Sequence, residues 1–164
     1  QQVIQKGDIN TEGLLATIKK MIYPDNTDRL GSKELTMSIS SDRPHILIIE
    51  DHIDNMITIK AILGNRYIIS EATDGVIGID KIKTLKPDMV LLDMTLPIKS
   101  GEEVLKEVRA DNHMKNIPIV AVTAMAMKGD KERFIEQGCS GYVSKPIDGD
   151  LLLSEIERFM KPNN

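Results

Sequence analysis

Short apolar runs alternate with amphipathic stretches along most of the chain after residue 44. The runs are apolar at consecutive positions rather than at every second one, which is typical of strands buried on both faces of a parallel sheet. They span residues 45–49, 67–69, 89–92, 119–122 and 142–143. The segments that follow them have apolar residues at spacings of three and four, which predicts amphipathic helices. These helices are expected at residues 54–63, 75–85, 101–109, 128–137 and 148–160.

Five strand–helix units in succession predict an α/β fold. Right-handed crossovers between parallel strands place helices on both faces, so the sheet is expected to be five-stranded, parallel and doubly wound. The flavodoxin-like (βα)5 order is the expected arrangement of five such strands. Ligands bind these sheets beyond the carboxyl ends of the strands, so the residues found there are the first candidates for a site.

The chain divides into three parts. Residues 1–26 contain a strand end and an extra N-terminal amphipathic helix, and residues 27–43, rich in Ser, Thr, Asp and Gly, read as a linker. Residues 44–162 form the α/β domain. Because the first residue is Gln1 rather than methionine, we expect a fragment excised from a longer chain.

The N-terminal part repeats the C-terminal end of the domain. Residues 13–24 align without a gap on residues 151–162, and a strand end with a lysine, Lys6 or Lys145, stands upstream of each. Residues 3–23 are therefore interpreted as the last strand and helix of a second domain of the same kind. An unrelated linker or a dimerisation helix is the open alternative, so self-association is one expected property.

Composition narrows the class of protein. The net charge is −4, aromatic residues make up 3% and tryptophan is absent, so the chain lacks the basic patch and stacking rings of a nucleic-acid binder. No apolar run approaches the roughly 18 to 20 residues that span a membrane, and no membrane contact is expected. The single cysteine, Cys139, fits a reducing compartment, and we expect a cytoplasmic location.

Polar residues suited to phosphate and metal chemistry follow four of the five predicted strands. They are Glu50, Asp51, Asp93, Thr123 and Lys145. Carboxylates and a hydroxyl beside an ammonium at one edge of the sheet suit Mg²⁺ and a phosphoryl group. Taken singly, each residue could instead be a helix cap, a turn residue or a solvated charge. Asp93 stands out because a wholly apolar strand precedes it.

Other candidate ligands receive no chemical assignment. The three histidines are scattered without ligand spacing, and two methionines near Thr123 are expected to pack or line a surface. These residues are His45, His52, His113, Met125 and Met127.

Residues 44–160 resemble the receiver domain of two-component response regulators. The motifs that carry the resemblance are Glu50-Asp51, Asp93 with Leu96-Pro97, Thr123-Ala124, and Tyr142 with Lys145-Pro146. Residues 123–130 further resemble receivers of hybrid histidine kinases or their stand-alone relatives. The chain departs from the common pattern at residues 98–101 and 140–141, which leaves the candidate chemical residues unaltered.

The resemblance implies a phosphorelay switch rather than an enzyme. Asp93 is expected to accept a phosphoryl group from the phosphohistidine of a histidine kinase or a histidine phosphotransfer domain. Asp51, Asp93 and the backbone carbonyl of Thr95 are expected to bind Mg²⁺, for which Mn²⁺ can substitute, with Glu50 acting through water. Lys145 is then expected to neutralise Asp93 and to hold a phosphoryl oxygen.

The resemblance also implies how the domain changes shape. Thr123 would move towards the phosphorylated Asp93, and Tyr142 would rotate into the space left behind. In relatives the peptide bond before Pro146 is cis.

Two other functions stay open. A haloacid-dehalogenase-like phosphatase also uses an Asp nucleophile and Mg²⁺, but it needs a second Asp where this chain has Thr95. A docking module that works without phosphorylation would normally have lost Asp93, an acidic residue of the pair, or Lys145.

The first predicted helix has more apolar residues than packing requires. The predicted inward stripe is Thr58, Ile59, Ile62 and Leu63, and the additional apolar residues are Ile53, Met56 and Ile57. These additional residues are expected either to receive a helix of the histidine-bearing partner or to be covered by the N-terminal segment.

Overall fold

The structure is a computed structural model that describes residues 43–125 and 127–160. The predicted N-terminal helix, the linker up to residue 42 and the hypothesis of an upstream domain remnant lie outside the described residues. Within the described ranges, no helix is long and apolar enough to cross a membrane.

Five parallel strands form one sheet in the order β2-β1-β3-β4-β5. This is the flavodoxin-like order, so the sequence-based prediction of the fold is confirmed. The strands are β1 (His45–Ile49), β2 (Ile68–Ala72), β3 (Met89–Asp93), β4 (Ile119–Thr123) and β5 (Gly141–Ser144).

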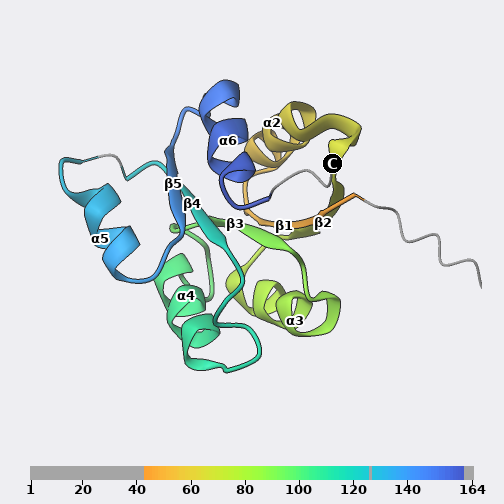
Figure 1. Cartoon of the computed structure of the whole chain (residues 1–164). Helices are drawn as coiled ribbons and strands as arrows, with labels where there is room; N and C mark the ends of the chain where they lie inside the picture. The colour runs from red at the N-terminus through yellow and green to blue at the C-terminus, as the bar shows by residue number, and fades with distance from the viewer. Residues whose placement is uncertain (1–42, 126, 161–164) are drawn as a thin grey trace, which may run out of the picture. The chain divides into compact units, whose positions relative to one another are not determined.

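Helices cover both faces of this sheet. In Figure 1, α2 and α6 lie on one face, and α3, α4 and α5 lie on the other. The helices are α2 (Ile53–Leu63), α3 (Gly75–Leu85), α4 (Gly101–Ala110), α5 (Asp130–Glu136) and α6 (Gly149–Glu157), with a 3₁₀ turn η1 (Gly64–Arg66) after α2.

The core consists of two apolar layers, one on each side of the sheet. Consecutive residues of β1 and β3 alternate between the layers, so that Leu91 faces α2 and α6 while Leu92 faces α3 and α4. All residues of β3 and β4 are buried. This explains why the strand sequences are apolar at consecutive positions.

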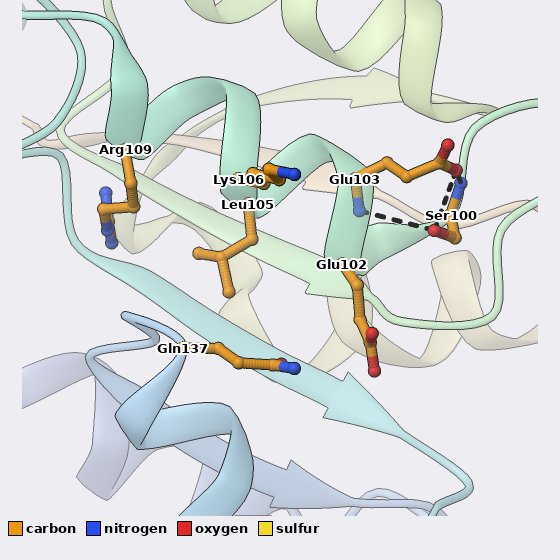
Figure 2. Close-up of a pocket in the computed structure, with 7 residues that line it drawn as sticks. All are labelled: Ser100, Glu102, Glu103, Leu105, Lys106, Arg109 and Gln137. Carbon is orange, nitrogen blue, oxygen red and sulfur yellow. Dashed lines mark hydrogen bonds between the residues drawn. The ribbon is translucent and has the colours of Figure 1, made fainter.

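The helices differ in how firmly they are anchored. The side chain of Asp74 caps α3 and that of Asp148 caps α6, while Ser100 and Glu103 form a reciprocal capping box at the start of α4 (Figure 2). The seven-residue helix α5 has no side-chain cap, and Phe134 is its one buried residue. It is therefore the least anchored helix of the described residues.

Two predicted boundaries were wrong for physical reasons. β2 was expected at residues 67–69, but it continues to Ala72 because Glu71 pairs with Ile48 in the ladder to β1. This edge strand is only partly buried, so its polar residues do not interrupt it. The helix α5 was expected to start at residue 128, but Gly129 has a φ of 97°, and the helix starts after it.

Candidate functional site

The predicted polar residues lie along the carboxyl edge of the sheet. Glu50 directly follows β1, Asp93 and Thr123 end β3 and β4, and Lys145 directly follows β5. Glu50 and Asp93 are each only 2% exposed, and Thr123 is fully buried. The parallel topology thus brings together residues that are up to 95 positions apart in sequence.

Lys145 joins two buried carboxylates. Its Nζ atom lies 2.7 Å from Glu50 Oε2 and 2.7 Å from Asp93 Oδ2. Buried charges require such partners because leaving water is costly for an unpaired ion. The peptide bond between Lys145 and Pro146 is cis, and the backbone N–H of Lys145 donates to the Thr123 carbonyl at 2.8 Å.

The carboxylates keep Lys145 charged. Burial by itself lowers the pKa of a lysine, since it penalises the ammonium form. Hydrogen bonds and charges from Asp93 and Glu50 outweigh this effect, and the pKa of Lys145 lies above its ordinary value. A fixed positive charge therefore stands beside Asp93 at neutral pH.

The second oxygen of Asp93 is also held. Asp93 Oδ1 accepts hydrogen bonds from the backbone N–H and from the hydroxyl of Thr95, both at 2.8 Å. Thr95 itself is exposed. Both oxygens of Asp93 thus have defined positions at the end of a buried strand.

Asp51 lies apart from this ion pair. Its side chain is 26% exposed, and its Oδ1 atom lies 3.1 Å from Nδ1 of His52. The hydrogen bond and charge of Asp51 raise the pKa of His52. Sequence reasoning assigned no chemistry to His52, because the three histidines of the chain are scattered without ligand spacing.

Sequence reasoning also missed Asn55. Its side-chain amide donates to Glu50 Oε1 at 2.9 Å, so Asn55 orients the carboxylate whose other oxygen binds Lys145. The available signal was the position of Asn55 in the first turn of α2, five residues after Glu50.

Thr123 and Tyr142 meet at the segment that follows β4. The hydroxyl of Thr123 accepts a hydrogen bond from the backbone N–H of Met125 at 3.1 Å. The Tyr142 ring stacks against Phe134 of α5 with a centroid separation of 6.1 Å. These contacts connect β4, β5 and α5 next to the carboxylates.

The donor set at this edge fits a magnesium ion. Carboxylate oxygens and backbone carbonyls are the ligands that Mg²⁺ prefers, and Asp51, Asp93 and Thr95 are the residues that would supply them. Among the described residues, Glu50, Asp51 and His52 form the group of possible ligands whose atoms all lie within 4.8 Å of one another. Asp93, with its oxygens facing Thr95 and Lys145, is not part of that group.

A hollow beside α4 is separate from the candidate site residues Glu50, Asp51 and Asp93. It has a volume of about 420 Å³, and Figure 2 shows Gln137, at the end of α5, among the residues around it. None of the predicted site residues lines it. The lining residues are Ser100, Glu102, Glu103, Leu105, Lys106, Arg109 and Gln137.

The fold and the motifs agree with one protein family. Residues 46–157 match the family model of the response regulator receiver domain. The chain belongs to this family and is a receiver domain of two-component signal transduction rather than a classical enzyme.

Relatives include stand-alone regulators and parts of kinases. The chain is 35% identical over 116 residues to the polar-differentiation response regulator DivK of Brucella anthropi, covering 70% of this chain and 94% of DivK. It is 32% identical over 119 residues to hybrid signal transduction histidine kinase D of Dictyostelium discoideum, covering 73% of this chain but 8% of that kinase.

A solved structure extends the comparison. The receiver domain of a sensor histidine kinase from Pseudomonas aeruginosa is 30% identical, with a TM-score of 0.66, covering 71% of this chain and 97% of that one. That crystal structure is described as having a magnesium ion coordinated in the active site cleft.

Proposed function

We propose that this chain is a switch in which Asp93 accepts a phosphoryl group from a phosphohistidine. The observation that carries the proposal is the contact of Lys145 with both Asp93 and Glu50 at 2.7 Å. This contact places a fixed cation beside a buried carboxylate at the end of β3, where a nucleophile for an electrophilic phosphorus would stand. Burying an ion pair costs about as much free energy as the pair returns, so stability alone does not explain why the buried strand β3 ends in the charged Asp93.

In the proposed reaction, an Asp93 oxygen forms a bond to phosphorus while the bond from phosphorus to the histidine nitrogen breaks. The leaving imidazole keeps the electron pair of that bond. Asp51, Asp93 and the Thr95 carbonyl would hold Mg²⁺, with Glu50 acting through water, and the ion supplies charge neutralisation for the phosphoryl oxygens. Lys145 would then bind a phosphoryl oxygen.

The switch would act through Thr123 and Tyr142. A phosphoryl oxygen on Asp93 offers the Thr123 hydroxyl a charged acceptor, and charge-assisted hydrogen bonds are stronger than neutral ones. Moving Thr123 removes the acceptor of the Met125 N–H. The segment around Met125 would then shift, and with it the environment of Tyr142 and α5.

The phosphodonor would be a histidine kinase or a histidine phosphotransfer domain that docks on α2. Ile53 and Ile57 support this surface, because they are 67% and 57% exposed.

The expected outer position of Met56 was wrong, since Met56 is 3% exposed. The expected inward position of Thr58 was also wrong, since Thr58 is exposed and its hydroxyl donates to the Asp54 carbonyl. The variant Ile57→Glu tests this docking surface. It should receive the phosphoryl group from a histidine kinase more slowly than the wild type, while its labelling by acetyl phosphate stays unchanged.

Labelling with acetyl phosphate tests the assignment of Asp93. With Mg²⁺ present, the wild type and Asp80→Asn, which changes an exposed residue of α3, should take up one phosphoryl group per chain. Asp93→Asn should take up none while keeping its circular dichroism spectrum. Full labelling of Asp93→Asn would show that the assignment is wrong.

The same assay separates the two other functions. Rapid turnover of phosphate esters without a stable labelled protein would indicate a phosphatase. No labelling and no turnover by the folded wild type would indicate a docking module that works without phosphorylation.

A further inference from the structure

His52 presents its imidazole to both acidic residues that precede it. The Nδ1 atom lies 3.1 Å from Asp51 Oδ1 and 3.9 Å from Glu50 Oε1. The His52 side chain is 74% exposed, so a solvated ion can reach the ring without rearrangement of the core. One ligand atom from each of the three residues lies within 4.8 Å of the others.

The His52 ring does not cap α2. His52 is the N-cap residue of this helix, where Ser, Thr, Asp or Asn would bind a free backbone N–H. Its side chain makes no capping hydrogen bond. The ring nitrogen contacts the two carboxylates instead.

Glu50 is buried and held in a fixed orientation beside the imidazole. Its Oε2 atom binds Lys145, while Oε1 accepts from the Asn55 amide at 2.9 Å and from the His52 backbone N–H at 3.2 Å. Such outer contacts fix the direction of a carboxylate and are typical of the groups around metal ligands. Oε1 is the Glu50 oxygen that faces the imidazole.

We propose that Glu50, Asp51 and His52 bind a first-row transition ion, such as Zn²⁺ or Co²⁺, at the edge of the proposed Mg²⁺ site. Imidazole nitrogen binds these ions well, whereas Mg²⁺ prefers oxygen ligands alone. Ligand atoms about 2.1 Å from one ion are separated by roughly 3.0 to 3.4 Å in octahedral or tetrahedral geometry. The 3.1 Å contact of His52 with Asp51 meets this spacing, and the 3.9 Å contact with Glu50 requires a shift of less than 1 Å.

Ion binding at this position would affect phosphorylation through Asp51. Asp51 is shared with the proposed Mg²⁺ site, so a transition ion on His52 and Asp51 competes with Mg²⁺. This consequence rests on the proposed function, whereas the binding of the transition ion does not.

Direct metal binding by the full chain tests the proposal. Co²⁺ is titrated by its visible absorbance and Zn²⁺ by calorimetry, on wild type, His52→Ala and His113→Ala. His113 is an exposed histidine that does not belong to the ligand group, which makes it the matched control. The background is small, since the chain has three histidines and its one cysteine is 5% exposed.

We expect wild type and His113→Ala to bind Co²⁺ and Zn²⁺ more tightly than Mg²⁺. His52→Ala should lose at least about tenfold in affinity for both transition ions while its Mg²⁺ affinity stays within about twofold. With Cu²⁺ bound, pulsed electron paramagnetic resonance should detect an imidazole nitrogen in wild type and in His113→Ala, but not in His52→Ala.

Either of two results would overturn the proposal. One is a His52→Ala variant that binds Co²⁺ as tightly as the wild type, and the other is a wild type that binds Zn²⁺ no more tightly than Mg²⁺. Asp93→Asn separates this inference from the proposed function: it should abolish phosphorylation but change Co²⁺ affinity less than threefold, since Asp93 is not among the three ligands.

Discussion

The hydroxyl of Tyr142 donates a hydrogen bond of 2.6 Å to the backbone carbonyl of Met125. The backbone N–H of the same residue donates to the Thr123 hydroxyl at 3.1 Å. Met125 is therefore held at both its N–H and its carbonyl by the two side chains proposed to change during switching. This contact ties β5 to the segment between β4 and α5.

Tyr142→Phe removes that hydrogen bond and keeps the ring that stacks on Phe134. We expect the free energy of unfolding in urea to fall by about 1 kcal/mol, the net contribution of one hydrogen bond. Tyr67→Phe is the control, because the Tyr67 hydroxyl makes no hydrogen bond to the described residues, and its stability should not change. Equal losses in the two variants would contradict this role of the Tyr142 hydroxyl.

Lys145→Ala leaves two carboxylates buried without their counterion. Glu50 and Asp93 have side chains that are 1% exposed, so the variant should lose about 3 kcal/mol of unfolding free energy. Lys106→Ala, at an exposed position of α4, should lose less than about 0.5 kcal/mol. Urea denaturation without divalent ions measures both, and similar losses would show that the ion pair does not stabilise the fold.

Gly101 lets α4 start close to the backbone of Asp93. A Cβ atom at this position would lie 2.4 Å from the Asp93 carbonyl oxygen and 2.5 Å from Met94 Cα. Gly101→Ala should therefore destabilise the domain by about 2 kcal/mol or more. Gly149 starts α6, and a Cβ there would have its nearest contact at 3.5 Å, so Gly149→Ala should leave thermal stability unchanged or raise it.

Ile98 occupies a backbone conformation that β-branched residues rarely adopt. Its φ is 66°, and its side chain is 83% exposed, so the position gives little packing in return. Ile98→Asn should raise the unfolding free energy by about 1 kcal/mol, since asparagine tolerates the left-handed region. Ile98→Val keeps the branched Cβ and should not be stabilising. A gain for valine equal to that for asparagine would argue against backbone strain.

Burial raises the pKa of the Cys139 thiol to about 11, although the charge of Arg109 opposes this. At pH 8 the folded protein should react with iodoacetamide at least about a hundredfold more slowly than the protein unfolded in urea. Because the folded state disfavours the thiolate, stability should fall as pH rises from about 8.5 towards 11. Equal alkylation rates in the two states would show that the thiol is accessible and ionised.

The sheet could be predicted from the sequence because the apolar pattern of each strand is local. The central strands are apolar at consecutive positions, as in residues 89–92, and polar residues such as Asp93 at their ends mark the carboxyl edge. The edge strand β2 gave a weaker signal, since Ser70 and Glu71 are polar yet remain paired with β1. The phase of α2 was misjudged because the apolar residues of this helix are spread around its axis, and only tertiary packing selects Met56, Ile59 and Leu63.

Within the candidate site, topology was predictable and side-chain direction was not. Parallel strands must bring Glu50, Asp93 and Lys145 to one edge, whatever their side chains do. The contact of Lys145 with Glu50, and the turn of His52 towards Asp51, depend on rotamers and on competing partners. No pattern of residue types in the sequence encodes those choices.

The single buried residue of α5 has a consequence for partial unfolding. Native-state hydrogen exchange divides a protein into units that open at different free energies, and a short helix with one anchor belongs to the low end of that scale. The amides of α5 should therefore exchange well before those of β3 and β4, which are buried throughout. In the proposed switch, phosphorylation of Asp93 would then need to displace only α5, the helix that separates from the sheet at the lowest free energy.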